Sequence, residues 1–187
     1  MYISLLKLLH MYKIVASLCL ISLLVSCGEQ HTHEPTAPVD VAESKKQVAM
    51  MLDSFNIAAA NADFEEYFSY YTEDAVFMGT DATEHWVKPE FMVWSKPFFD
   101  KGKAWNFTAL QRNIYFNKTG DLGWFDELLN TQMKICRGSG VVVKQGDSWK
   151  VQQYVLSMTV PNSEVDPVVA IKAPVEDSII NALSRKE

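Results

Sequence analysis

The chain has 187 residues, of which 48% are hydrophobic and 21% are charged, so it has enough apolar residues for one core and is not disordered throughout. Acidic residues outnumber basic ones by 23 to 17, and the net charge of −6 argues against a surface that binds nucleic acid. The length is typical of a single domain with short additional segments.

The N-terminal segment has the layout of a secretion signal. Residues 14–26 form an uncharged apolar stretch that follows two lysines, and this stretch is short for a membrane span, which needs about 20 residues. It ends in LVSCG, residues 24–28, which resembles the lipobox of bacterial lipoproteins. The resemblance implies that Cys27 receives the lipid and anchors the protein to a membrane of the bacterial cell envelope. An ordinary secretion signal with an incidental cysteine is the alternative.

These features divide the chain into four parts. We expect a signal peptide at residues 1–26, a lipidated tether at 27–40, a folded domain at 41–163 and a tail with a short helix at 164–187. The tether is polar, contains two prolines and has no apolar period. With Cys19 in the signal and Cys27 lipidated, Cys136 is left without a disulfide partner, and we expect it to be a buried structural thiol.

Helical periodicity begins at the start of the domain. A helix of about twenty residues is expected from Val41 onward, because apolar residues recur at three- and four-residue steps. These residues are Val48, Met51, Leu52, Phe55 and Ala59. The pair Asp63 and Glu66 has the spacing of a capping box, which predicts the start of a second helix.

A strand and a third helix are expected next. The short apolar run at residues 75–78 predicts the strand. Asp81 and Glu84 repeat the capping-box spacing, and Pro89 suits the first turn of a helix that ends before Gly102. His85 would then lie just inside the start of this helix.

Strands dominate the second half of the domain. Apolar and β-branched runs separated by turn sequences predict strands at residues 105–117, 123–130, 134–144 and 149–160. A last helix is expected at 174–185, with an apolar side that needs a partner. Helices followed by a run of antiparallel strands predict an α+β fold.

Four stretches resemble the signature segments of SnoaL-like domains. They are FMGTD at 77–81, GWFDE at 123–127, RGSG at 137–140 and WKVQQYVLS at 149–157. Over residues 45–162 the chain thus resembles the nuclear transport factor 2-like superfamily, which includes ketosteroid-isomerase-like and SnoaL-like proteins. The resemblance implies a cone-shaped, curved antiparallel sheet wrapped around the N-terminal helices, an apolar pocket at the mouth of the cone, and a homodimer formed through the sheet. It indicates the fold and not the activity, because this fold has many functions.

The histidine count restricts the chemistry of the domain. His85 is the only histidine beyond the tether, which argues against a zinc cluster or another histidine-based metal site. A serine triad is also not supported, because the chain has no G-x-S-x-G sequence. We therefore expect no metal and no cofactor. His85 and Trp86 are placed at the pocket mouth, and a partly exposed helical histidine is the alternative for His85.

Carboxylates are the remaining candidates for acid and base catalysis. Asp126 and Glu127 are neighbours on a predicted strand, so only one of them can face the pocket. If the following turn is centred near residues 131–132, Asp126 faces Arg137 across the ladder, and the arginine lowers the pKa of Asp126. A cross-strand ion pair at the pocket rim is the structural alternative to a catalytic Asp126, and Arg137 is also a ligand-binding candidate. Asp81 is a further ligand-binding candidate, for which a helix cap is the structural alternative.

The last strand supplies polar groups. By alternation, one face of this strand carries Trp149, Val151, Gln153, Val155 and Ser157. Many SnoaL-like relatives have histidine or another polar residue at the position of Val155, so the resemblance implies that a catalytic group is missing. Gln153 and Ser157 can orient a ligand by hydrogen bonds, and Trp86 and Trp124 are the expected pocket lining.

Two hypotheses for the function follow. In the first, a membrane-anchored lipoprotein binds a small, largely apolar molecule, or a partner protein, in its pocket. In the alternative, the domain is an isomerase, cyclase or hydrolase with Asp126 as the general base. The hydrogen-bond donors to an oxyanion would then be Gln153, Ser157 or His85. The missing catalytic histidine favours the first hypothesis, and the position of Asp126 relative to the pocket and to Arg137 separates the two.

Overall fold

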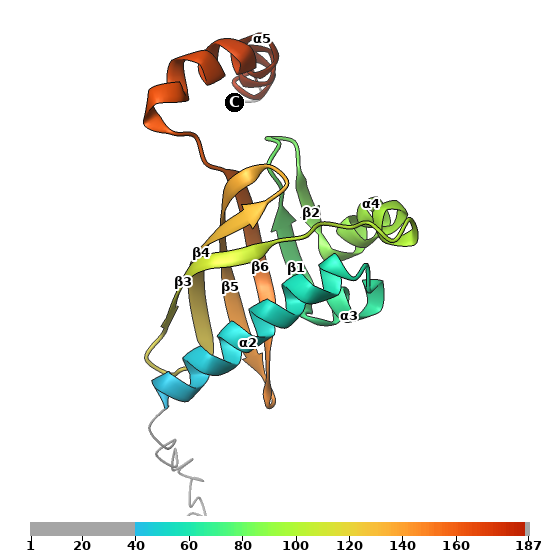
Figure 1. The fold of residues 1–187 in the computed structure, drawn as a ribbon, viewed down its shortest axis with the longest axis vertical. Helices are drawn as coiled ribbons and strands as arrows, with labels where there is room; N and C mark the ends of the chain where they lie inside the picture. Colours follow the sequence, from blue (N-terminus) through green and yellow to red (C-terminus); the bar gives the residue numbers. More distant parts are fainter. Residues whose placement is uncertain (1–39, 186–187) are drawn as a thin grey trace, which may run out of the picture. The chain divides into compact units, whose positions relative to one another are not determined.

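The computed structural model describes residues 40–185 of the chain (Figure 1). Cys27 and the predicted signal peptide lie outside the described residues. Within this range the helical elements are α2 (Val41–Ala60), α3 (Phe64–Ser69), α4 (Lys88–Asp100), the 3₁₀ turn η1 (Asn162–Glu164) and α5 (Val165–Leu183). The strands are β1 (Tyr71–Met78), β2 (His85–Val87), β3 (Thr108–Phe116), β4 (Leu122–Thr131), β5 (Lys134–Gln145) and β6 (Ser148–Met158).

The first two helices begin where the sequence predicts them. Asp40 caps α2, because its carboxylate accepts hydrogen bonds from the backbone N–H groups of Ala42 and Glu43, both at 3.0 Å. The carboxylate of Asp63 caps α3 by accepting a hydrogen bond of 3.1 Å from the N–H of Glu66. The apolar face of α2 is buried in the core, as its periodicity predicts.

The segment that contains Asp81 and Glu84 is a turn and not the start of a helix. The carboxylate of Asp81 accepts hydrogen bonds from the N–H and the hydroxyl of Thr83, and these bonds hold the pKa of Asp81 below its usual range. Residues 85–87 then pair with β1, so His85 lies in strand β2. Helix α4 begins only at Lys88, with a proline in its first turn as predicted. A local Asx turn competes here with the predicted cap, and strand pairing favours the turn.

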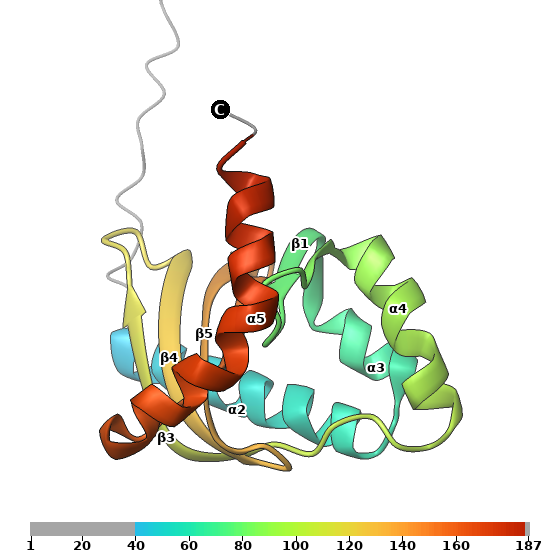
Figure 2. The ribbon, with the colours of Figure 1, turned by 90° about the horizontal axis from the view of Figure 1, so that it is seen from above.

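The six strands form one curved mixed sheet in the order β2-β1-β6-β5-β4-β3. Strands β3 to β6 form an antiparallel meander, and β1 joins it by pairing in parallel with β6. Helix α2 crosses the strands obliquely (Figures 1 and 2). The architecture confirms the α+β class and the helices packed against a curved sheet. Within residues 40–185, the parallel β1–β6 pair is the one departure from a purely antiparallel sheet.

The sheet has an inner face, which packs against α2, α3 and α4, and an outer face on the opposite side. Burial along β4 alternates between these faces. Phe125, Glu127 and Leu129 are buried on the inner face, whereas Asp126 belongs to the outer face. The prediction that Asp126 and Glu127 point to opposite faces is therefore confirmed.

A β-bulge in β6 changes which side chains share a face. The register with β5 shifts because β6 contains one extra residue between Val151 and Gln153. The inner-face residues of β6 are Trp149, Val151, Tyr154 and Leu156. The outer-face residues are Gln153, Val155 and Ser157. The prediction that one face extends from Trp149 to Ser157 is wrong, because simple alternation ignores the bulge.

The remaining predictions concern Cys136 and the C-terminal helix. Cys136 is a free thiol at 0% exposure, as predicted. Helix α5 begins at Val165, nine residues before the predicted start, and Pro174 lies inside it. None of the residues of α5 is buried. Among residues 40–185, no helix combines the length and the hydropathy that a membrane crossing requires.

Candidate functional site

A cavity of about 140 Å³ lies on the inner side of the sheet. Its walls come from the end of β1, from α4, from the segment that leads into β3, from the β4–β5 turn and from β6. The apolar lining consists of Phe77, Phe91, Trp94, Trp105, Phe107, Met133 and Leu156. The remaining lining residues are Gly79, Thr80, Glu84 and Gln132. Aromatic rings therefore form most of the wall, and Glu84 supplies its one carboxylate.

The aromatic wall is held together by ring stacking. Phe77 on β1 and Phe91 on α4 lie parallel, with ring centroids 4.1 Å apart and an interplanar angle of 4°. The rings of Trp94 and Trp105 each lie 5.9 Å from Phe91 at angles of 22° and 21°. The two distances of 5.9 Å are within the range of favourable aromatic pairs, and the Phe77–Phe91 pair is closer than that range. Contacts between the rings themselves therefore fix the shape of the cavity wall.

Glu84 holds its carboxylate at the cavity through local contacts. Its side chain is half-buried, and its Oε2 atom accepts a hydrogen bond of 3.2 Å from the N–H of Asp81. The carboxylate also lies directly over Gly79, so a β-carbon at position 79 would overlap it. The spacing of Asp81 and Glu84 predicts a helix cap, but in the structure it belongs to a turn. Glu84, the second residue of this spacing, is the residue that gives the cavity its negative charge.

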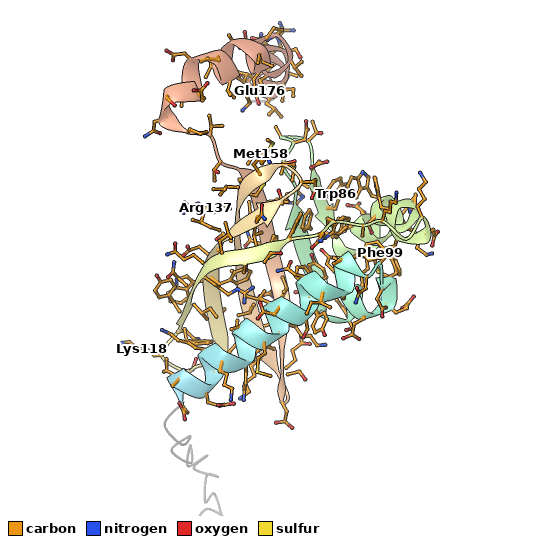
Figure 3. All side chains as sticks on the ribbon, viewed as in Figure 1. Trp86, Phe99, Lys118, Arg137, Met158 and Glu176 are labelled. Atoms are coloured by element: carbon orange, nitrogen blue, oxygen red, sulfur yellow. The ribbon has the colours of Figure 1, made fainter. Side chains whose placement is uncertain are left out.

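Trp86 and Asp81 lie next to the cavity but do not line it. The indole of Trp86 packs behind the wall, 5.7 Å from the ring of Phe91 and 4.6 Å from that of Trp94. Figure 3 shows Trp86 on the side of the molecule where α4 lies. Asp81 is exposed and contributes its N–H to Glu84. Both residues therefore support lining residues and do not contact the cavity themselves.

The other predicted site residues lie on the outer face of the sheet. They are His85, Trp124, Asp126, Arg137, Gln153 and Ser157. Trp124 is 45% exposed and stacks on Tyr115. Arg137 is paired with Ser157 across β5 and β6, and Figure 3 shows its side chain on the side away from Trp86. The structure thus gathers most of the predicted site residues on one face, but this face is not the face with the aromatic cavity.

The predicted pairing of Asp126 with Arg137 is wrong. Asp126 faces Ser139, and Arg137 faces Leu128. The turn between β4 and β5 is closed by Thr131 and Lys134, so its centre lies one residue later than predicted and the register moves by two residues. The carboxylate of Asp126 instead accepts a hydrogen bond of 3.0 Å from the side-chain amide of Asn113.

His85 and Gln153 do come together, in a hollow on the outer face. This hollow has a volume of about 400 Å³ and is also lined by Asp74, Val76, Met78, Val141 and Gln152. His85 reaches it because residues 85 and 78 pair across β1 and β2. The hollow is more open and more polar than the aromatic cavity, and its lining includes one histidine and one aspartate.

A buried polar network connects α2 to the sheet. Glu127 is 1% exposed, and its carboxylate accepts hydrogen bonds from Arg112 at 2.8 Å and from the Tyr154 hydroxyl at 2.9 Å. Arg112 also donates to the carbonyl of Ala49 and to the carboxylate of Asp53 on α2. The network does not line the cavity, and its hydrogen bonds stabilise the packing of α2 on the sheet.

Burial and charge shift the pKa values of this network. Burial alone would lower the pKa of Arg112, but the attraction of Glu127 and hydrogen bonds to Glu127 and Asp53 raise it above its ordinary value. Burial and the negative charge of Glu127 raise the pKa of Tyr154 well above its usual range. Arg112 is therefore charged and Tyr154 neutral at physiological pH.

The fold is shared with solved structures of low sequence identity. A nuclear transport factor 2-like protein of unknown function from Pseudomonas putida KT2440 is 14% identical, with a TM-score of 0.56 over 65% of this chain and 90% of that chain. A candidate dehydratase of the same family from Streptomyces avermitilis is 14% identical, with a TM-score of 0.56 over 64% of this chain and 99% of that chain. A domain of unknown function with a cystatin-like fold from Nostoc punctiforme PCC 73102 is 13% identical, with a TM-score of 0.55 over 76% and 96%.

Such identities are informative about the fold alone. No curated protein that was compared with the chain matches it. The family model described as a SnoaL-like domain matches residues 48–161, which is more than half of the 187-residue chain. The match begins within α2 and ends just after β6, so it contains every strand of the sheet and the whole aromatic cavity. This protein belongs to the SnoaL-like domain family.

Proposed function

We propose that the SnoaL-like domain binds a small, largely apolar molecule in the aromatic cavity. The observation that carries the proposal is the composition of the cavity wall, in which five aromatic rings, a methionine and a leucine surround a few polar groups. The volume of about 140 Å³ matches a ligand group the size of one aromatic ring, because a cavity of about 150 Å³ holds benzene. A protein side chain of this size is the largest part of a partner protein that could enter.

We further propose that the domain is attached to a membrane of the bacterial cell envelope by a lipid on Cys27. The support for this proposal is the sequence pattern of residues 14–28. A binding domain on a lipidated tether would hold its ligand close to the membrane surface.

The enzymatic alternative stays a prediction. Its proposed base, Asp126, belongs to the outer face of the sheet, whereas the aromatic cavity lies on the inner side. Asp126 is free of Arg137 but does not lie in an apolar cavity, so a reaction in the aromatic cavity could not use it as a base.

Two neighbouring residues of β6 provide a matched test of the binding proposal. Leu156 lines the cavity, and Ser157 lies on the outer face. We expect Leu156→Phe to fill the cavity and to weaken the binding of toluene, followed by NMR chemical shifts, by about tenfold or more. Ser157→Phe adds more bulk at the next position and should leave toluene binding unchanged.

Three results of the binding measurements would count against the proposal, and a stability measurement adds a fourth. The first three are toluene binding that is absent from the full chain, binding that survives Leu156→Phe, or binding that Ser157→Phe abolishes. A lower melting temperature for Leu156→Phe, with a cost of about 1–3 kcal/mol, would show that the site is a packed core, because overpacking destabilises cores and not open cavities.

A further inference from the structure

The charge of the aromatic cavity is of one sign. Glu84 is the only ionisable side chain among its described lining residues, which include no lysine, arginine or histidine. The ion pairs among residues 40–185 involve other carboxylates, those of Glu73, Asp53, Glu127, Asp100 and Glu176. The negative charge of Glu84 is therefore not neutralised by a side chain in the described part of the chain. A bound cation would neutralise it.

The aromatic wall favours the same kind of ligand. The face of an aromatic ring carries a partial negative charge, and it attracts organic cations within about 6 Å of its centre. Tryptophan is the strongest ring in such contacts, and the wall contains both Trp94 and Trp105. Aromatic rings together with a carboxylate are suited to a cation whose charge is surrounded by methyl groups.

On these grounds we propose that the cavity selects small organic cations, with a methylated ammonium group as the part that enters it. The inference rests on the proposed function and specifies the class of its ligand. Glu84 supplies the opposite charge and the aromatic rings surround the methyl groups. The volume of about 140 Å³ accommodates one such head group. Thr80 and Gln132 are the lining residues that can form hydrogen bonds with a polar tail.

The surroundings of the cavity disfavour other classes of ligand. An anion would meet Glu84 and no positive partner, which is costly in an apolar site. A metal ion is not favoured either, because residues 40–185 contain no group of three histidine, cysteine, aspartate or glutamate side chains arranged to hold one. The net charge of −6 for the whole chain attracts cations toward the protein.

Gly79 leaves the space that the carboxylate of Glu84 occupies, because it has no side chain. A β-carbon at this position would overlap the carboxylate of Glu84. The backbone angle φ of Gly79 is not in the left-handed region, so the backbone accepts alanine there. The substitution Gly79→Ala therefore displaces the charge of Glu84 without removing it.

The test compares two probes of the same shape with the full chain. Choline carries a trimethylammonium group, and in 3,3-dimethylbutan-1-ol a carbon atom replaces the charged nitrogen. We expect isothermal titration calorimetry to give an affinity for choline that is higher by about tenfold or more. Glu84→Gln should remove this preference and leave the affinity for the alcohol unchanged, and Gly79→Ala should weaken choline binding in the same direction.

The control is Glu65→Gln, which removes the same charge from an exposed position on α3 and should leave both affinities unchanged. Equal affinities for the two probes, or an equal loss of both in Glu84→Gln, would overturn the cation proposal while the binding proposal stands. If neither probe binds the full chain and toluene does not bind either, both proposals fail. Circular dichroism of each variant verifies that the fold is intact.

Discussion

Glu127 is a carboxylate that the fold holds inside the core. Its partners Arg112 and Tyr154 come from two other strands, so the charge connects β3, β4 and β6. We expect Glu127→Gln to lower the free energy of unfolding by about 3 kcal/mol, because it leaves Arg112 buried without its main counter-charge. Urea denaturation measures this loss.

The neighbouring residue provides the control for this prediction. Asp126→Asn makes the same chemical change at the next position of β4, but on the outer face. The expected loss is below about 1 kcal/mol, because this side chain forms one hydrogen bond to Asn113 at a half-buried position. Equal losses for the two variants would mean that the Arg112–Glu127 pair does not stabilise the fold.

At the residue scale, the sequence shows residues that belong to the site, such as Glu84, but it does not show which residues contact one another. The spacing of Asp81 and Glu84 was visible, yet a D-x-x-E sequence fits both a helix cap and a turn. Pairing of His85 with Met78 decides between them, and this is a contact between strands that no local pattern contains. The contacts of Arg112 and Tyr154 with Glu127 could not be predicted, because they join three strands whose register the sequence does not determine.

At the element scale, the bulge in β6 determines which residues face the cavity. Gln152 and Gln153 are both polar, so no hydropathy signal marks the extra residue. The four strands of the meander were predicted to within a few residues, because turn sequences separate them, whereas β2 was expected to be part of a helix. The faces of β6 were not predicted, since one extra residue exchanges the faces of the residues that follow it. The register of β4 with β5 was not predicted either, since the turn between them is centred one residue later than expected.

Three buried tyrosines lie on α3, β1 and β6, and they make the free energy of unfolding depend on pH in the alkaline range. They are Tyr67, Tyr71 and Tyr154. The hydroxyl groups of Tyr67 and Tyr71 are 3.0 Å apart. Burial raises the pKa of both, and that of Tyr154, above the usual range. Above pH 10 the unfolded chain releases protons that the folded chain keeps, so stability falls as the pH rises, by about 1.4 kcal/mol per unit for each tyrosine. Urea denaturation between pH 9 and about 11.5 measures the slope.

The variant Tyr71→Phe tests whether the buried tyrosines cause the loss of stability at alkaline pH. Tyr71→Phe removes one ionisable hydroxyl and should make the loss of stability above pH 10 shallower by the share of one tyrosine. A slope equal to that of the unmodified chain would assign the alkaline sensitivity to other groups. At pH 7 the variant loses its hydrogen bond to Tyr67, which costs about 1 kcal/mol.

Helix α5 and the outer face of the sheet both expose apolar side chains. On α5 these are Val165, Val169, Ile171, Val175, Ile180 and Leu183. On the outer face Trp124 and Tyr115 are about half exposed. We expect these side chains to contact a second copy of the chain in the predicted homodimer.

Truncation tests the part that α5 takes in this dimer. We expect sedimentation of the mature domain at tens of micromolar to give twice the mass of one mature chain. Removal of residues 164–187 should shift the equilibrium toward the monomer, because it exposes no new core and removes one of the two apolar surfaces. A strictly monomeric full chain would contradict the prediction.

For the whole molecule, the order of helices and strands was sufficient to predict an α+β fold. The meander from β3 to β6 follows from short turns between neighbouring strands. The parallel pairing of β1 with β6 does not, because it joins segments about 80 residues apart in the chain. The aromatic cavity depends on this long-range pair, since Phe77 belongs to β1 and Leu156 to β6.

The last prediction concerns attachment of the whole molecule to the membrane. We expect the protein with its natural Cys27 to fractionate with membranes, and a wash with high salt should not release it. The chain is negatively charged overall, so basic residues do not hold it on the membrane, whereas several acyl chains on one residue give a stable anchor. Cys27→Ala should appear in the soluble fraction or retain its signal peptide. Mass spectrometry of the mature protein locates the modification, and an unmodified N-terminus at a residue other than Cys27 would contradict the lipid anchor while leaving the aromatic cavity and its proposed ligand untouched.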